Sequence, residues 1–173
     1  MRRLLLTLLC GLIVVPAALA GVRATGDGVL ELKSVSGFVQ IGTADQPATG
    51  ALWGQMDRGR LTIVDPVVGD GAVYVSGWEH RTPTDDSPRT VVYTGRDLHF
   101  RVTGGKYRLI FQGSGIDLTA VGIGVAQLAG DDSALNPGSY AVDSGKWIPV
   151  PVLLGLKQTV SVSFPAQTTS QTP

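Results

Sequence analysis

Short runs of strand-forming residues follow many of the glycines in this chain, which has 23 glycines in 173 residues. The runs are rich in β-branched and aromatic residues, which fit a pleated and half-buried surface. No window of helical length carries apolar residues at a sustained spacing of about 3.6 with an N-cap before it. The pattern predicts an all-β fold, and the clearest runs are 29–32, 38–41, 51–53, 60–64, 72–75 and 159–164.

The spacing between these glycines is uneven, whereas a solenoid repeats a fixed period. Uneven spacing favours an antiparallel β-sandwich or barrel of about ten or more short strands. A short β-solenoid is the alternative. Prolines and acidic residues predict exposed loops, which we expect at 43–49, 79–89 and 131–137.

The stretch 98–111 predicts a β-hairpin that turns at Gly104-Gly105. A Gly-Gly pair suits a two-residue turn because both residues adopt positive φ without a Cβ clash. This register places apolar side chains opposite one another on a single face. The expected pairs are Val102 with Tyr107, Phe100 with Leu109, and Leu98 with Phe111.

The other face of this predicted hairpin presents His99, Arg101 and Arg108. Arg101 and Arg108 stand opposite each other in this register, and like charges in that position are unfavourable. Neighbouring carboxylates, water or a bound anion can offset them. The three residues are therefore candidate ligand-binding residues, although a solvated face with borrowed carboxylates is the simpler interpretation.

Residues 1–20 have the organisation of a secretory signal peptide. Met1-Arg2-Arg3 is a charged start, residues 4–15 are almost wholly apolar, and Ala18-Leu19-Ala20 supplies a small-x-small cleavage site. The apolar run is short for a membrane span, so a retained anchor is the alternative. The sequence predicts a secreted or cell-envelope protein with no membrane span after the signal is removed.

Removing these 20 residues from 173 leaves 153, enough for one domain with a core. We expect a single β domain at 28–164, after a lead-in at 21–27 and before a disordered tail at 165–173. The single cysteine, Cys10, lies in the signal, so the exported domain is free of disulfides. Without Arg2 and Arg3, 12 of the 14 basic residues remain against 14 acidic residues, a formal net charge of −2. That balance does not suggest nucleic acid or a polybasic membrane contact.

Motifs for catalysis or metal binding are weak. The two histidines, His80 and His99, have no cysteine partners for a zinc site, and no Gly-x-Ser-x-Gly element is present. Asp143-Ser144-Gly145 resembles the aspartic-protease signature, but that chemistry needs a second carboxylate and the motif occurs once. A hairpin turn explains it more simply. The sequence predicts no enzyme, no metal and no cofactor.

Trp53, Trp78 and Trp147 lie within strand-like runs or at their ends. Tryptophan in a β-domain usually packs into the core or its rim. An exposed ring can instead stack against a sugar. The three tryptophans are therefore candidate glycan-stacking residues, and burial of their rings would remove that interpretation.

The segment Gly95–Arg101, continuing through Gly104–Arg108 and Gly115–Gly122, resembles small secreted proteins of actinobacteria that have no assigned function. A weaker similarity extends from Leu30 to Trp147. The resemblance implies an exported β-rich domain. It implies no activity, and it assigns no functional residues.

These observations together predict an exported, non-catalytic binding or structural domain of the cell envelope or extracellular space. The alternative is a carbohydrate-binding module or a small secreted hydrolase. Its partner would be an unknown molecule of the envelope or the extracellular space. Self-association is also compatible with the prediction, because the edge strands of an open sheet must be protected.

Overall fold

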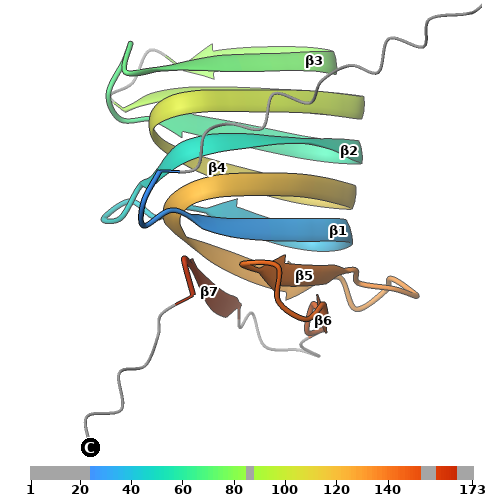
Figure 1. Ribbon diagram of the computed structural model, residues 1–173. Helices are drawn as coiled ribbons and strands as arrows, with labels where there is room; N and C mark the ends of the chain where they lie inside the picture. Colours follow the sequence, from blue (N-terminus) through green and yellow to red (C-terminus); the bar gives the residue numbers. More distant parts are fainter. Residues whose placement is uncertain (1–23, 85–87, 153–158, 167–173) are drawn as a thin grey trace, which may run out of the picture.

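The computed structural model describes residues 24–84, 88–152 and 159–166. The predicted signal peptide at 1–20 and most of the predicted tail at 165–173 lie outside these residues. The described part contains strands and no helix (Figure 1). The strands are β1 (Gly28–Ile41), β2 (Ala48–Asp65), β3 (Gly71–Thr84), β4 (Arg89–Gly130), β5 (Ser139–Val142), β6 (Ile148–Pro149) and β7 (Val160–Phe164).

All seven strands belong to one sheet, in which β4 pairs with β1, β2, β3 and β7. The 42-residue β4 reaches so many partners because it passes along the sheet more than once. Its first pass, 89–107, lies between β3 and β2, and its second pass, 108–123, lies between β2 and β1. The β2, β3 and β7 ladders with β4 are antiparallel. Along β1, the paired residues of the second pass follow in decreasing order, from Gly122 beside Gly28 to Leu109 beside Ile41.

The long strands bend sharply near their middles, and the bends line up across the sheet. Gly59 of β2 pairs with Gly95 on one side and with Gly113 on the other, and Gly113 also pairs with Gly37 of β1. Gly59 has φ of 149°, and a Cβ there would collide with the carbonyl oxygen of Gln112. Glycine is therefore needed where neighbouring backbones approach this closely. We call this row of bends the fold line.

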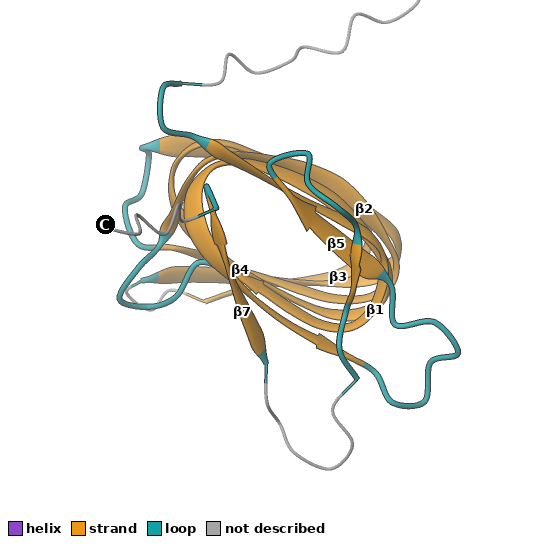
Figure 2. Ribbon diagram, turned by 60° about the horizontal axis from the view of Figure 1, so that its bottom comes forward, coloured by secondary structure: helices purple, strands orange, loops and turns teal. Residues whose placement is uncertain are grey.

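The fold line divides the sheet into two layers that enclose one core. Figure 2 shows the strands curving around a flattened oval. The first layer contains 28–33, 49–56, 71–76, 98–104 and 116–122. The second contains 37–41, 59–65, 78–84, 89–95, 108–113 and 126–130.

Alternate side chains of both layers point into this core. Phe100 of the first layer meets Phe111 of the second with ring centroids 4.9 Å apart. The largest fully buried side chains include Phe111, Phe164, Leu30, Ile41, Leu52 and Met56. Burial of each such side chain stabilises the fold by about 1.5–3 kcal/mol.

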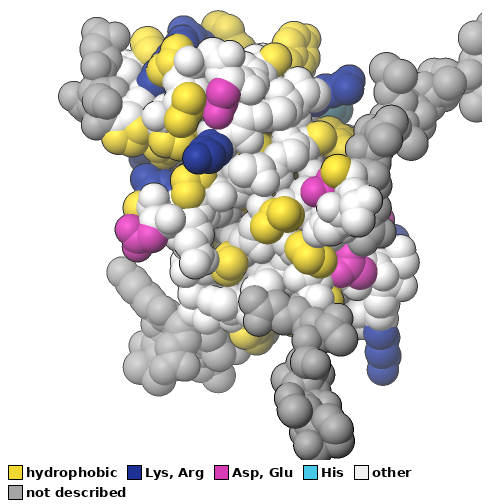
Figure 3. Space-filling model, turned by 60° about the vertical axis from the view of Figure 1, so that its left-hand side comes forward, with side chains coloured by type: hydrophobic (Ala, Val, Ile, Leu, Met, Phe, Trp, Pro, Cys, Tyr) yellow, Lys and Arg dark blue, Asp and Glu magenta, His cyan; other side chains and the backbone are white. Residues whose placement is uncertain are grey.

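The two ends of the stack of strands differ. At the lower end in Figure 1, β5 and β6 extend the first layer beside β1, and β7 pairs with the end of β4. At the upper end, β3 pairs with β4 alone among the described strands, and residues 71–74 are exposed. Figure 3 shows hydrophobic side chains gathered near this upper end, among lysine and arginine side chains. Arg81 lies over the ring of Tyr93 there, at 5.8 Å from its centroid.

The all-β prediction is confirmed, and the architecture is sandwich-like. The predicted number of short strands is wrong, because runs 29–32 and 38–41 are the two halves of β1, and runs 51–53 and 60–64 are the two halves of β2. The loops at 43–47 and 131–138 and the last strand agree with the sequence. The predicted loop at 79–89 is wrong for residues 79–84, which continue β3.

The predicted hairpin at 98–111 is also wrong. Val102 pairs with Leu52 and Val73, whereas Tyr107 pairs with Ala48, so β2 lies between the two expected arms. Gly104 and Gly105 do adopt positive φ, of 73° and 77°, as the turn chemistry required. They carry the chain from the first layer to the second. Both arms face the same core from opposite sides, which produces the same apolar alternation as a hairpin.

Candidate functional site

The outward face of the first layer carries an open groove of about 640 Å³. It lies over strands whose alternate residues, such as Leu32, Phe100 and Leu118, are buried in the core. The neighbouring positions therefore point outward, as strand geometry requires. The outward residues that line the groove are Glu31, Lys33, Trp53, Gln55, Tyr74, His99, Arg101, Asp117 and Thr119, and Trp147 joins them from the turn after β5.

The strand registers order the outward residues in two rows. The first row runs Tyr74, Arg101, Trp53, Thr119, Glu31 from β3 to β1. The second row runs Ser76, His99, Gln55, Asp117 over the same strands. Neighbouring strands lie about 4.8 Å apart, so Arg101 stands directly between Tyr74 and Trp53.

Three aromatic side chains remain exposed around this groove. The exposed fractions are 38% for Trp53, 66% for Tyr74 and 44% for Trp147. Tyr74 and Trp53 are separated by one intervening strand, so their backbones are about 10 Å apart. Aromatic rings at this spacing form separate platforms along one surface.

The basic and acidic side chains of the groove are unevenly divided between its two sides. His99 and Arg101 come from the first pass of β4, whereas Glu31, Asp117 and a single lysine, Lys33, come from β1 and from the second pass. His99 Nε2 lies 3.1 Å from Asp97 Oδ1.

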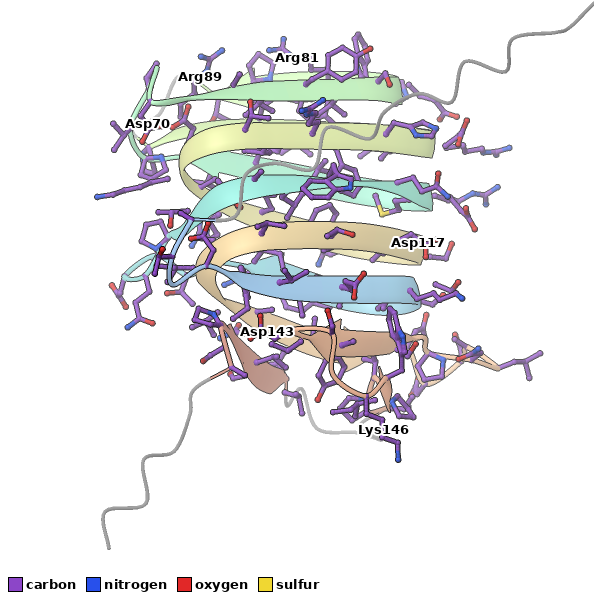
Figure 4. All side chains as sticks on the ribbon, in the orientation of Figure 1. Asp70, Arg81, Arg89, Asp117, Asp143 and Lys146 are labelled. Carbon is purple, nitrogen blue, oxygen red and sulfur yellow. The ribbon has the colours of Figure 1, made fainter. Side chains whose placement is uncertain are left out.

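Asp117 lies near the fold line (Figure 4), and its Oδ1 accepts a hydrogen bond from the backbone N–H of Ser34 at 2.9 Å. Arg101 has no ion pair or side-chain hydrogen bond with any residue of the described ranges. A charged donor is therefore left open to a ligand.

The groove brings together four of the sequence-predicted residues: His99, Arg101, Trp53 and Trp147. Trp78 lies apart from them on β3, where it pairs with Gly95 beyond the fold line. Trp78 is still 45% exposed. Exposure of all three tryptophans keeps the glycan-stacking interpretation open.

The predicted pairing of Arg101 with Arg108 is wrong. Arg108 lies in the second layer opposite Val64, whereas Arg101 lies in the first. The Nε of Arg108 is buried and has no hydrogen-bond partner among the described residues. The two arginines are separated because Gly104 and Gly105 carry the chain from the first layer to the second and do not close a hairpin.

The sequence interpretation missed Tyr74, Gln55, Glu31 and Asp117 as members of the groove. A signal for two of them was present in the chain. Glu31 and Asp117 each lie between buried residues, as Glu31 does between Leu30 and Leu32, whereas Tyr74 follows the exposed Val73. The alternation identifies such positions, but the order of the strands is needed to place them side by side.

The Asp143-Ser144-Gly145 motif forms a turn, as the simpler interpretation predicted. Asp143 and Ser144 have positive φ, of 51° and 59°. The carboxylate of Asp143 accepts backbone hydrogen bonds from Val29 at 2.9 Å and from Ala166 at 2.8 Å. This side chain therefore joins the turn after β5 to the start of β1 and to the residues that follow β7.

Two perturbed ionisable groups lie away from the groove. Burial raises the pKa of the Tyr107 hydroxyl well above its ordinary value. The backbone N–H of Ser133, followed by its hydroxyl, lowers the pKa of Asp131 in the loop before β5. Among the described residues, no group of three or more His, Cys, Asp or Glu side chains is placed to hold a metal ion. The described part also has no helix that is long and apolar enough to cross a membrane.

Comparisons of the chain with protein-family models, curated proteins and solved structures found no match. The fold and the groove define the class: an all-β domain with an exposed aromatic groove on one face of a folded sheet. The resemblance to small secreted actinobacterial proteins stays a prediction.

Proposed function

We propose that this protein is an exported, non-catalytic binding domain that holds an extended carbohydrate in the groove of its first layer. The observation that carries the proposal is the exposure of Trp53, Tyr74 and Trp147 around one open groove. The C–H face of a sugar ring is apolar and stacks on such rings, while its hydroxyls need polar partners. Gln55 and Thr119 supply such partners in the same groove.

Single exposed hydrophobic side chains are normal on a protein surface. Grouping is the informative feature here, because the three rings stand over one surface with polar side chains between them. The separation of Tyr74 and Trp53, about 10 Å, is comparable with the distance between alternate rings of an extended glycan. The predicted signal peptide at 1–20 supports the same function, since export would bring the groove to envelope or extracellular polysaccharides.

The test is isothermal titration calorimetry of the purified exported protein against a panel of soluble oligosaccharides. We expect Trp53→Ala to weaken binding by about tenfold, the effect of losing one aromatic platform. Trp78→Ala is the matched control, because its ring is similarly exposed but lies outside the groove. The proposal fails if no glycan binds, or if both variants lose affinity equally.

A second candidate function is supported by Glu31 and Asp117. Glu31 pairs with Thr119, and Asp117 is two residues away on that strand, so the two carboxylates are diagonal neighbours. The backbones of diagonal neighbours are about 7–8 Å apart. Side chains on such backbones can bring two carboxyl groups to the separation of about 6.5–9.5 Å that inverting glycosidases use. Binding without turnover is the first choice because Asp117 already accepts a backbone hydrogen bond. Release of reducing ends by the wild type, lost in both Glu31→Gln and Asp117→Asn, would establish the hydrolase instead.

A further inference from the structure

Arg101 occupies the centre of the aromatic part of the groove. It pairs across the sheet with Tyr74 on one side and with Trp53 on the other, and all three side chains point outward. A guanidinium in this position is flanked by two stacking platforms. A sugar on either platform therefore brings its substituents within reach of the arginine.

No carboxylate of the described residues forms an ion pair with Arg101. Glu31 lies three strands away from it along the same row. That separation is roughly 14 Å at the ordinary strand spacing. It exceeds the screening length of about 10 Å at 0.1 M salt. Asp97, which is closer along the chain, lies against His99 instead.

We propose that the groove selects acidic glycans, with the carboxylate of a uronic acid bound to Arg101 while its ring stacks on Trp53 or Tyr74. This inference rests on the proposed carbohydrate-binding function and names its substrate class. Arginine suits the role because its planar fork donates two parallel hydrogen bonds to one carboxylate. Stacked rings on both sides would also exclude water from that contact and strengthen it.

The acidic side chains at the far side of the groove favour one placement of the bound glycan. Glu31 and Asp117 repel a second carboxylate, and Lys33 beside them offsets only one of the two negative charges. Gln55 and Thr119 accept neutral sugars between the two sides. An alternating glycan of acidic and neutral sugars therefore fits the groove better than a run of uronic acids.

The test compares each acidic glycan with its own carboxyl-reduced form, which keeps the linkage and replaces the charge with a hydroxyl. Hyaluronan, alginate and galacturonan oligosaccharides serve as probes for the wild type, Arg101→Gln and Arg96→Gln. Arg96 is the control, because it lies at the fold line with Glu79 3.9 Å away and outside the groove. Circular dichroism and thermal melting establish that each variant is folded.

We expect the wild type to bind at least one acidic form about tenfold more tightly than its reduced partner, the effect of one charge-assisted contact. Arg101→Gln should lose this preference and its salt dependence while it still binds the reduced form, and Arg96→Gln should keep both. If the wild type binds reduced and acidic forms equally, or if Arg101→Gln keeps the preference, the inference is overturned and the carbohydrate function stands. If no glycan of either kind binds, both are overturned.

Discussion

The two outer faces of the folded sheet are made by the same strands but carry different side chains. The row Tyr74, Arg101, Trp53, Thr119, Glu31 crosses the first layer. The matching row in the second layer is Thr82, Val92, Thr62, Ile110, Gln40. Each strand or pass contributes one residue to each row.

The two rows differ in residue type and exposure, and only the second has the composition that a stable sheet requires. Thr62, Val92 and Ile110 are β-branched and half-buried, which is the ordinary composition of a stable strand. Trp53 and Tyr74 instead expose large rings, and Arg101 exposes a charge that has no ion-pair partner in the described part of the chain. The same strands build both layers, so the difference lies in the outward side chains, and it is these that place the proposed binding in the first layer.

The core that both layers share should show the largest effect of a single substitution. Phe111 is fully buried and contacts Phe100 of the opposite layer. We expect Phe111→Ala to lower the free energy of unfolding by about 3–5 kcal/mol. Urea denaturation measures this, with Trp53→Ala expected within about 0.5 kcal/mol of wild type. Equal losses in both variants would mean that Trp53 is a core residue and would break the comparison.

The fold line should show the next largest effect. Gly59 and Gly69 both have positive φ, but only Gly59 would place a Cβ against the neighbouring backbone, since nothing lies within 4 Å at Gly69. We therefore expect Gly59→Ala to cost about 1–3 kcal/mol more than Gly69→Ala in urea denaturation. Equal costs would show that backbone conformation, and not the close approach of strands, requires glycine at the fold line.

Tyr107 lies just after the Gly104-Gly105 turn that joins the two layers, and its buried hydroxyl should make stability depend on high pH. Burial raises the pKa of this group in the folded state above its unfolded value. Between the two pKa values only the unfolded chain releases the proton, so stability falls as pH rises. The slope is about 1.4 kcal/mol per pH unit above about pH 10.

Tyr107→Phe should remove this part of the alkaline loss, measured as the difference from wild type in urea midpoints between pH 9 and about 11.5. Tyr74→Phe is the control, because that side chain is exposed in the first layer. A Tyr107→Phe profile parallel to that of wild type would contradict a buried, neutral hydroxyl.

The sequence predicted the strand segments and the inward residues well but not how they combine. Alternation correctly identified Phe100, Val102, Leu109 and Phe111 as inward-facing. It could not distinguish a hairpin from a strand that folds over, because both direct the same residues to one core. The register between strands far apart in the sequence decides that question, and a local pattern does not contain it.

The same limit explains the candidate site. His99, Arg101, Trp53 and Trp147 were singled out for their chemistry, and the structure places them in one groove. Tyr74 and Asp117 were missed because only the order of β3, β4 and β2 makes them neighbours of these residues. The false partner, Arg108, came directly from the assumed hairpin.

Arg101 and Arg108 belong one to each layer, so substituting them compares the two layers directly. The expected changes in stability are the smallest of those predicted. The Nε of Arg108 is buried with no partner in the described part of the chain, whereas Arg101 is exposed in the groove. Arg108→Met keeps the apolar stem and removes the unpaired donor, so we expect it to raise the free energy of unfolding by about 1 kcal/mol. Arg101→Met should change stability by less than about 0.5 kcal/mol and should instead remove the preference for acidic glycans. If Arg108→Met lowers stability, the buried donor is not the unpaired group described above. If it changes glycan selectivity as Arg101→Met does, binding is not confined to the first layer.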